Sequence, residues 1–317
     1  MTARARELLA QAVLAAALAL LAWYFVSNTA ANLEARRIAS GFAFLWREAG
    51  FEIGETAGLA YSAADSYLRA LAIGLANTFR IAVIGVVFAT VLGALLGLAR
   101  LSPNWLLAKL AAAYVELIRN VPLLVQLFFW YAVLSENLPG PAEALNPLPG
   151  VFLSNRGIFI PLPGSTPQLS GFNFSGGASL SPEFAALLLG LVTYTAAFIG
   201  EIVRAGILSV HRGQIEAAYS LGLARRAAMR FVILPQALRL IVPPMTSQYL
   251  NLTKNSSLAV AIGYPDLVSI ANTTINQTGQ AIEGIAIIMG VYLTISLSIS
   301  AFMNWYNRRV ALRGSAR

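Results

Sequence analysis

The feature that most constrains this chain is a series of long apolar runs that contain few charged residues. About 20 consecutive apolar residues are enough to cross the hydrocarbon core of a bilayer as a helix, and several runs approach or exceed that length. The runs are continuous and do not alternate apolar with polar residues, which favours helices over a transmembrane β-barrel. The sequence therefore predicts a polytopic, all-α membrane protein.

Composition narrows the possible functions. Only 11% of the 317 residues are charged and 57% are hydrophobic, with a mean hydropathy of +0.68, whereas soluble domains carry about 25% charged residues. The chain has no cysteine, which excludes disulfides, thiol catalysis and Cys-ligated metals. The single histidine, His211, argues against a histidine metal centre. We expect no metal site and no catalytic residue.

The net charge of +8 is explained better by membrane orientation than by nucleic-acid binding. The Lys and Arg residues flank the apolar runs, and such residues are enriched in cytoplasmic loops. We therefore expect a multi-pass protein with its N- and C-termini in the cytoplasm and with no nucleic-acid partner.

Six membrane spans satisfy the charge pattern. The first run ends in bulky aromatic residues at 23–25, which favours a spanning helix over a cleaved signal peptide. The fifth is interrupted by Pro243-Pro244 and by the polar run TKNSS. The predicted spans are approximately 11–27, 71–100, 110–134, 183–208, 237–270 and 281–306.

These spans divide the chain into three parts. Residues 1–67 hold the first transmembrane helix and a periplasmic loop, residues 68–310 form the main transmembrane domain, and residues 311–317 form a cytoplasmic tail. Residues 135–182 are rich in Pro, Gly, Ser and Asn, which predicts an irregular periplasmic insertion without a span of its own.

The second predicted span carries Asn77 and Arg80 near its outer end, followed by Gly85, Gly93 and Gly97. Small residues allow the backbones of membrane helices to approach closely. We expect these glycines to form a helix–helix contact.

A basic segment, GQIEAAYSLGLARRAAMRFVILPQALR, separates the fourth and fifth spans. It predicts a short helix over Gln214–Ala218, a bend at Gly222 and a second helix over Ala224–Phe231 that Pro235 stops. Exposed alanines allow close backbone approach. The segment therefore suits insertion into a groove of another protein.

The pattern EAA, three residues, Gly, nine residues, an aliphatic residue, one residue and LP resembles the EAA loop of ATP-binding-cassette (ABC) importer permeases. This chain has Val232 at the aliphatic position, where the family usually has Ile. The resemblance implies that the loop, residues 213–235, is a coupling helix that sits in a cleft of a separate ATPase. The residues assigned to this role are Gly213, Gln214, Glu216, Ala217, Ala218, Gly222, Leu234 and Pro235.

Other stretches narrow the resemblance. YVELIRNVPLLVQLFF, TAAFIGEIVRAGILSV and NLTKNSSLAVAIGYPDL resemble permeases for polar amino acids, over about residues 74–307 apart from the insertion. The additional N-terminal span and the long insertion resemble the larger subfamily that imports general L-amino acids, or glutamate, glutamine, aspartate and asparagine. The implied fold is the helical bundle of the type I importer permease (MetI-like) class.

The resemblance also implies partners. They are two copies of an ABC ATPase, a second, non-identical permease subunit, a periplasmic amino-acid-binding protein, a polar L-amino acid and the lipid of a bacterial inner membrane. A phosphate-binding P-loop requires Gly before Lys, but neither Lys109 nor Lys254 follows a glycine. We therefore expect no cofactor on this chain, ATP and Mg²⁺ on the partner ATPase, and no enzymatic activity of the chain itself.

Charges inside the apolar runs are the first candidates for the substrate path, because they are costly in a bilayer. Glu116 and Arg119 stand three residues apart, as do Glu201 and Arg204, so each pair shares a helix face and can neutralise itself. Together with Gln126 they could bind the ammonium and carboxylate of an amino acid. Alternatively, the pairs anchor helices near the cytoplasm.

The run TKNSS supplies the second group of candidates, Lys254, Asn255, Ser256 and Ser257. They cannot all face lipid, so they indicate a water-lined cavity, a helix break or protein partners. A break would direct free backbone N–H groups toward a substrate carboxylate. The alternative is a structural kink that continues from Pro243-Pro244.

Two other functions compete with a permease that is driven by a separate ATPase. In a secondary transporter driven by an ion gradient, Glu116, Glu201 and Glu283 would relay protons or bind Na⁺, but no inverted repeat is evident in the sequence. A membrane enzyme would need a catalytic constellation, which the sequence lacks.

Overall fold

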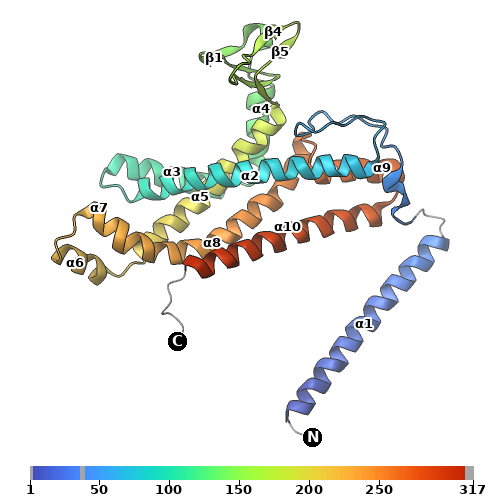
Figure 1. Ribbon diagram of the computed structural model, residues 1–317, viewed down its shortest axis with the longest axis horizontal. Helices are drawn as coiled ribbons and strands as arrows, with labels where there is room; N and C mark the ends of the chain where they lie inside the picture. The colour runs from blue at the N-terminus through green and yellow to red at the C-terminus, as the bar shows by residue number, and fades with distance from the viewer. Residues whose placement is uncertain (1–2, 36–39, 311–317) are drawn as a thin grey trace.

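The computed structural model describes residues 3–35 and 40–310. The tail at 311–317 therefore lies outside the described residues. Helices dominate, and the insertion carries strands (Figure 1). The α-helices are α1 Ala3–Ala35, α2 Tyr67–Arg100, α3 Trp105–Asn120, α4 Leu123–Ser135, α5 Pro182–Leu208, α6 Arg212–Ser220, α7 Arg225–Ala228, α8 Leu234–Asn255, α9 Leu267–Thr278 and α10 Ala281–Val310. The shorter helical segments are Phe42–Trp46, Pro141–Glu143, the π-helical Met229–Ile233 and the 3₁₀ segment Ser256–Ile262.

Six membrane crossings are consistent with the helices. Five helical stretches are long and apolar enough to cross a bilayer by length and composition: Arg6–Thr29, Tyr67–Arg100, Pro182–Leu208, Arg225–Ile262 and Ala281–Arg309. Helices α3 and α4 together supply a sixth, but they are bent by 105° relative to each other.

The bend corrects the prediction of one straight third span. Val121, between the two helices, is extended with φ −97° and ψ 128°. The ring of the following Pro122 disfavours helical backbone at the preceding residue, so α3 ends at Asn120 and α4 begins at Leu123.

Helix α5 is the centre of the bundle and packs against α2, α4 and α8 (Figure 1). A glycine of α5 lies at each of these three contacts. A Cβ on Gly190 would lie 2.4 Å from Leu127 of α4, and a Cβ on Gly206 would lie 2.3 Å from Ile241 of α8. These glycines therefore set how closely the helices approach.

The α2–α5 crossing is the tightest of these contacts at the backbone level. A Cβ on Gly93 would lie 2.5 Å from Ile199, and a Cβ on Gly97 would lie 2.7 Å from the carbonyl oxygen of Gly200. A Cβ on Gly85 would meet Leu252 of α8 at 3.2 Å. The predicted packing role of the glycines in α2 is confirmed.

The insertion between α4 and α5 is a small β-structure. Its strands are β1 Leu145–Leu148, β2 Val151–Ser154, β3 Gly157–Ile160, β4 Gln168–Ser170, β5 Asn173–Ser175 and β6 Ala178–Leu180. Strands β1-β2-β3-β6 form an antiparallel sheet, and β4 and β5 form a separate hairpin. Phe174 of the hairpin packs on Phe152 and Phe159 of the sheet, with ring centroids 4.6 and 4.8 Å apart. The insertion projects from the bundle at the ends of α4 and α5 (Figure 1).

The prediction of an irregular insertion was therefore wrong, although the absence of a span in it holds for the described helices. Its strands are three or four residues long, which is too short to show an alternating pattern. The glycines that suggested a loop instead make the turns between the strands. Gly150 and Gly171, for example, have φ of +80° and +63°, a backbone conformation that glycine adopts without steric cost.

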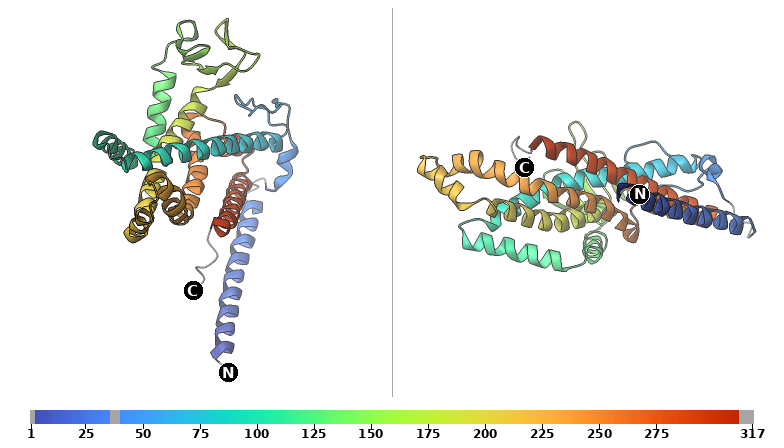
Figure 2. Two further views of the ribbon diagram at one scale, coloured as in Figure 1. Left: turned by 60° about the vertical axis from the view of Figure 1, so that its left-hand side comes forward. Right: turned by 90° about the horizontal axis from the view of Figure 1, so that it is seen from below.

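A second, smaller core joins the loop that precedes α2 to the bundle. Phe44 and Ile73 are buried against Leu267 and Ile270 of α9. A Cβ on Gly74 would lie 3.0 Å from the Asp266 carbonyl oxygen, so α2 and α9 are in close contact here. The loop before α2, α9 and the start of α5 thus meet on the side of the bundle that carries the insertion (Figures 1 and 2).

Candidate functional site

The candidate coupling segment, residues 213–235, runs through α6 and α7 to the start of α8 and lies at the opposite end of α5 from the insertion (Figure 1). The ring nitrogen Nδ1 of His211 accepts a hydrogen bond of 3.1 Å from the N–H of Gly213, which caps the start of α6. His211 is thus a capping residue here.

The end of α6 is closed by Gly222, which has φ +79°. The N–H of Leu223 donates to the Ala218 carbonyl at 3.1 Å, and the N–H of Gly222 donates to the Tyr219 carbonyl at 2.9 Å. This is the Schellman arrangement, in which a residue with positive φ lets two N–H groups satisfy the last carbonyls of a helix. The bend predicted at Gly222 is confirmed.

Helix α6 exposes most of the EAA pattern. Gln214, Glu216 and Ala217 are exposed, whereas Ala218 faces inward and is 3% exposed. Leu221 and Phe231 are also exposed, at 82% and 67%. Large exposed apolar side chains next to a small-residue helix form a surface that a partner can cover.

The structure corrects the role expected of Pro235. The helical backbone continues from α7 through the π-helical turn Met229–Ile233 into α8, and Pro235 lies in the first turn of α8. The π-helical turn directly before Pro235 already departs from regular α-helical hydrogen bonding, which accommodates the N–H that proline lacks. Leu234 and Pro235 therefore join the coupling segment to the span and do not stop a helix. Likewise α8 continues through Pro243 and Pro244.

A charged cluster occupies the α2–α5 crossing just beyond Gly97. Glu201 of α5 forms ion pairs with Arg100 of α2 and with Arg204 one turn along. Arg204 Nε donates to Glu201 Oε2 at 3.1 Å. The predicted Glu201–Arg204 contact is confirmed, and Arg100 is an additional partner that the sequence analysis did not include.

The other predicted pair does not form. Glu116 and Arg119 are both exposed and make no ion pair among the described residues. The guanidinium of Arg119 instead lies 4.9 Å from the ring centroid of Phe198 on α5. Cations are attracted to the negative face of an aromatic ring. Arg119 therefore contacts α5 close to the Glu201 cluster, and Glu116 is not part of that cluster.

Replacing Glu201 by glutamine is expected to destabilise the bundle by about 1–3 kcal/mol, because two partly buried guanidinium groups lose the negative charge and one of the two acceptor oxygens that they share. Replacing exposed Glu116 by glutamine on α3 should have almost no effect. Thermal unfolding of both variants in the same detergent measures the difference. Equal stability of the two variants would show that the cluster contributes nothing to stability.

Gln126 supports the α3–α4 bend. Its side-chain amide donates to the carbonyl oxygens of Ile118 at 2.9 Å and Val121 at 3.0 Å, which are among the last carbonyls of α3. Its Oε1 is buried and has no partner among the described residues. The donors of Gln126 are thus committed to the backbone, and only the oxygen remains for another ligand.

The TKNSS run lies at the C-terminal end of α8, where the carbonyls are exposed. Ser256 Oγ donates to the Thr253 carbonyl and Ser257 Oγ donates to the Lys254 carbonyl, both at 2.7 Å. The chain continues as the 3₁₀ segment Ser256–Ile262. The predicted break with free N–H groups was therefore wrong, because the hydroxyls satisfy carbonyls at a negative helix end.

Lys254 is exposed at this helix end and Asn255 is partly exposed. Lys254, Ser257, Met289 and Tyr292 are among the residues that line a cavity of about 400 Å³ between α8, α9 and α10. The run therefore borders a cavity, but most of its lining is apolar, whereas the sequence alternative was a water-lined cavity. In residues 3–35 and 40–310, no group of three or more His, Cys, Asp or Glu side chains could hold a metal ion.

A bundle of helices, five of them long and apolar enough to cross a bilayer, is the architecture of a polytopic membrane protein. Residues 89–312 match the family described as binding-protein-dependent transport system inner membrane component. The chain belongs to this family.

Curated relatives agree over almost the whole chain. The putative amino-acid ABC transporter permease protein YhdX of Escherichia coli K12 is 46% identical, over 94% of this chain and 92% of YhdX. The general L-amino acid transport system permease protein AapQ of Rhizobium johnstonii is 41% identical, over 92% of this chain and 88% of AapQ. The resemblance to ABC permeases of the polar amino acid family is confirmed.

Solved structures confirm the fold. A chain from a crystal structure of an amino acid ABC transporter with histidines is 27% identical and aligns with a TM-score of 0.57, over 77% of this chain and 95% of that chain. A chain of the inward-facing MetNI methionine ABC transporter is 20% identical with a TM-score of 0.52, over 78% and 96% of the two chains. The MetI-like helical bundle is thus the fold of this protein.

Proposed function

We propose that this chain is the permease subunit of an ABC importer for polar L-amino acids and that α6 couples it to a separate ATPase. One observation carries the coupling role: the EAA–Gly segment is an exposed helix closed by a positive-φ glycine, and it lies between the two spans α5 and α8. The names of the relatives support the substrate class, since they include a general L-amino acid permease and a glutamate/glutamine/aspartate/asparagine permease.

The partners follow from the same comparisons. GltJ and GltK of Escherichia coli, both named glutamate/aspartate import permease proteins, are 35% and 31% identical to this chain, which supports a second, non-identical permease. The family description supports a binding protein. The proposed assembly therefore contains this chain, a second permease, two ATPase copies that bind ATP and Mg²⁺, and a periplasmic amino-acid-binding protein.

The proposed orientation puts α6, α7 and both chain ends in the cytoplasm of a bacterial cell and the insertion in the periplasm. Arg204, Arg212, Arg225, Arg226 and Arg230 surround the coupling segment, which agrees with the enrichment of basic residues in cytoplasmic loops. The insertion, in contrast, has Glu143 and Arg156 as its charged residues between 137 and 181. It is the proposed docking surface for the binding protein.

Movement of α6 would be transmitted through continuous helix. Because α7 passes through the π-helical turn into α8 without a break, displacement of the segment by ATPase closure would tilt α8. Helix α5 would follow, since Gly206 packs it closely on Ile241. Tilting of both spans would expose the path alternately to the two sides of the membrane.

Several predicted residues remain candidates for the substrate path. Arg119, Glu201 and Arg204 belong to one neighbourhood on α3 and α5, and Lys254, Asn255 and Ser257 lie at the end of α8. Ser256 is fully buried and bonded to the backbone, and Gln126 has only its oxygen free. We propose that Ser256 and Gln126 have a supporting role. The residues proposed to contact the substrate are Arg119, Glu201, Arg204, Lys254, Asn255 and Ser257.

The secondary-transporter alternative receives less support. Glu201 is already paired with two arginines, and Glu283 accepts a hydrogen bond of 2.6 Å from the N–H of Gly41. Exposed Glu116 makes no ion pair among the described residues, so the weight against this alternative comes from the membership of the chain in a binding-protein-dependent transport family. ATP-independent uptake by the isolated chain, driven by an imposed gradient, would favour this alternative over the proposal.

The coupling role is tested at Gly222. Replacement by valine is expected to lower copurification with the ATPase and ATP-dependent uptake at least tenfold, because a β-branched residue is strained at positive φ. A Cβ at Gly222 meets no atom within 4 Å, so the effect is on backbone conformation. Asparagine, which tolerates positive φ, is the matched control and should retain uptake.

Charge reversal at the exposed residue Glu216 gives an independent test. Glu216→Arg should also lose the ATPase, whereas Glu143→Arg, on the insertion at the opposite end, should copurify with the ATPase normally. Uptake at the original rate in both Gly222→Val and Glu216→Arg would refute the coupling role.

A further inference from the structure

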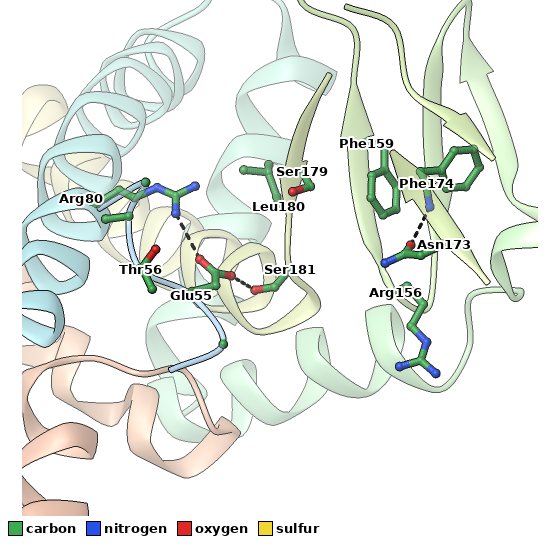
Figure 3. Close-up of a pocket in the computed structure, with 13 residues that line it drawn as sticks. Glu55, Thr56, Arg80, Arg156, Phe159, Asn173, Phe174, Ser179, Leu180 and Ser181 are labelled. Carbon is green, nitrogen blue, oxygen red and sulfur yellow. Dashed lines mark hydrogen bonds and ion pairs between the residues drawn. The ribbon is translucent and has the colours of Figure 1, made fainter. Parts of the chain in front are cut away.

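A polar cavity of about 610 Å³ lies where the insertion meets the membrane bundle. Its walls come from three parts of the chain: residues 54–58 before α2, Arg80 of α2, and residues of the insertion and its junction with α5, which include Arg156, Asn173 and Ser181 (Figure 3). Its volume is in the usual range of small-molecule sites, about 300–1,000 Å³. The proposed coupling of α6 to an ATPase assigns no role to this cavity.

Glu55 is the centre of the bundle side of the cavity. Its Oε2 accepts from Arg80 Nη1 at 3.1 Å, and its Oε1 accepts from the Ser181 hydroxyl (Figure 3). The guanidinium of Arg80 also lies 4.2 Å from the ring centroid of Phe184. These contacts hold a carboxylate and a guanidinium in fixed positions at the cavity wall, and each group still has unused donor or acceptor capacity.

The insertion side of the cavity offers groups without such partners. Arg156 is exposed and makes no ion pair among residues 40–310. Asn173 uses its Oδ1 to accept from the N–H of Phe174 at 2.9 Å, so its amide N–H₂ can donate to a ligand. Both belong to the wall formed by the insertion, which is separate from the wall that carries Glu55 and Arg80 (Figure 3).

A second cavity, of about 450 Å³, adjoins the first and shares Gly54, Glu55 and Ser181 with it. Its wall adds the carboxylates Glu52 and Glu183. Glu55 and Arg80 thus place an anion and a cation side by side, which matches the ammonium and the carboxylate that an α-amino acid carries on one carbon. Arg156, on the wall formed by the insertion, is available to a side-chain group of such a ligand (Figure 3).

We propose that the first cavity is an outer binding site for a zwitterionic L-amino acid. This inference rests on the proposed function, which puts the insertion on the periplasmic side and makes amino acids the cargo. The α-carboxylate would bind the free donors of Arg80, the α-ammonium would bind Glu55, and Arg156 and Asn173 would bind an acceptor on the side chain of the ligand. The site would receive the substrate before it enters the path between the spans.

Arg156 also predicts a preference among amino acids. It makes no ion pair among residues 40–310, and the carboxylates Glu52 and Glu183 line the adjoining cavity and not the wall formed by the insertion. A side-chain carboxylate on the ligand is attracted to Arg156, whereas a side-chain ammonium is repelled. Glutamate should therefore bind more tightly than leucine, and leucine more tightly than lysine.

Equilibrium dialysis with radiolabelled L-glutamate, L-leucine and L-lysine tests the site. The assembled transporter is used in nanodiscs without the binding protein. The double variant Arg156→Gln/Asn173→Ala is expected to weaken glutamate binding at least tenfold, and Arg47→Gln, an exposed arginine outside the cavity, should bind like the unchanged protein. Unchanged binding by the double variant, no saturable binding, or tightest binding of lysine would each overturn the proposal.

Uptake by the complete system separates this inference from the proposed function. If amino acids are imported with ATP but the double variant takes up and binds glutamate like the unchanged protein, only the outer site is refuted. If no amino acid is imported at all, the proposed function itself fails. A fall in glutamate uptake by the double variant with unchanged ATPase copurification supports both.

Discussion

Gly97→Ala should lower the thermal stability of the protein clearly, and Gly97→Leu should prevent recovery of a folded bundle. The alanine Cβ would lie 2.7 Å from the Gly200 carbonyl oxygen and 2.8 Å from the Val203 side chain. A backbone carbonyl cannot turn aside as a flexible side chain can, so α2 and α5 must separate. Overpacking of this kind costs about 1–3 kcal/mol for small additions and more for large ones.

Gly290 of α10 provides the matched control, since a Cβ there meets no atom within 4 Å. Both changes replace a glycine inside a helix and both gain about 0.5–1 kcal/mol of helix propensity. The difference in unfolding temperature between Gly97→Ala and Gly290→Ala, measured in one detergent, therefore isolates the contact. Equal temperatures would mean that α2 and α5 can separate at this crossing without loss of stability.

The same crossing illustrates what the sequence could predict. Glycines spaced along one apolar run indicate close packing without identifying the partner helix, because composition records only that a small side chain is needed. That α5 is the partner, and that Arg100 reaches Glu201 just beyond the glycines, depends on how two spans about 100 residues apart in the chain are aligned. Local spacing contains no information on this alignment.

Sequence rules predicted the backbone conformation correctly where it depends on a single residue. They failed where it depends on the neighbouring residues. Gly222 was predicted to bend the chain and does so, because positive φ is a property of that residue alone. Pro235 was predicted to stop a helix, but the helical backbone continues through it. Because a π-helical turn precedes it, the proline lies in the first turn of α8, where its missing N–H costs little. The spans followed from apolar length, whereas the 105° bend between α3 and α4 and the strands of the insertion did not.

The candidate sites show the same division. The EAA segment could be located because its residues are contiguous and their spacing is specific. The cavity at Glu55 could not, because its wall combines a loop, a span and an insertion that lie far apart in the sequence. Arg80 and Glu55 each resemble ordinary residues near a membrane surface, and only the fold brings them to 3.1 Å.

Asp266 is a buried carboxylate that sequence reasoning missed. It is fully buried between the 3₁₀ segment after α8 and the start of α9, where its Oδ1 accepts from the N–H of Ser269 at 2.8 Å and caps the helix. Its Oδ2 makes no hydrogen bond of good geometry among the described residues, although the hydroxyl of Tyr292 lies near the carboxyl. Removal from water disfavours the charged form, and burial raises the pKa of the Asp266 carboxyl to about 7, against the opposing effect of the N–H groups of Ser269 and Val268.

Asp266→Asn is therefore expected to remove a decline in stability between about pH 4 and pH 7. In that interval the folded protein retains a proton on Asp266 that the unfolded chain, with an ordinary pKa of about 3.9, has lost. Unfolding then releases a proton, so stability falls as the pH rises, by up to about 1.4 kcal/mol per pH unit. Asparagine cannot ionise but still accepts the Ser269 N–H, so the variant should match the unchanged protein near pH 4 and exceed it at pH 8.

Thermal unfolding at pH 5, 6, 7 and 8 in one detergent measures this difference in stability. Asp65→Asn, a change in the loop before α2, is the control that keeps the original profile. If Asp266→Asn kept that profile as well, the carboxyl would have to be ionised in the folded protein, and a partner for its Oδ2 would be required.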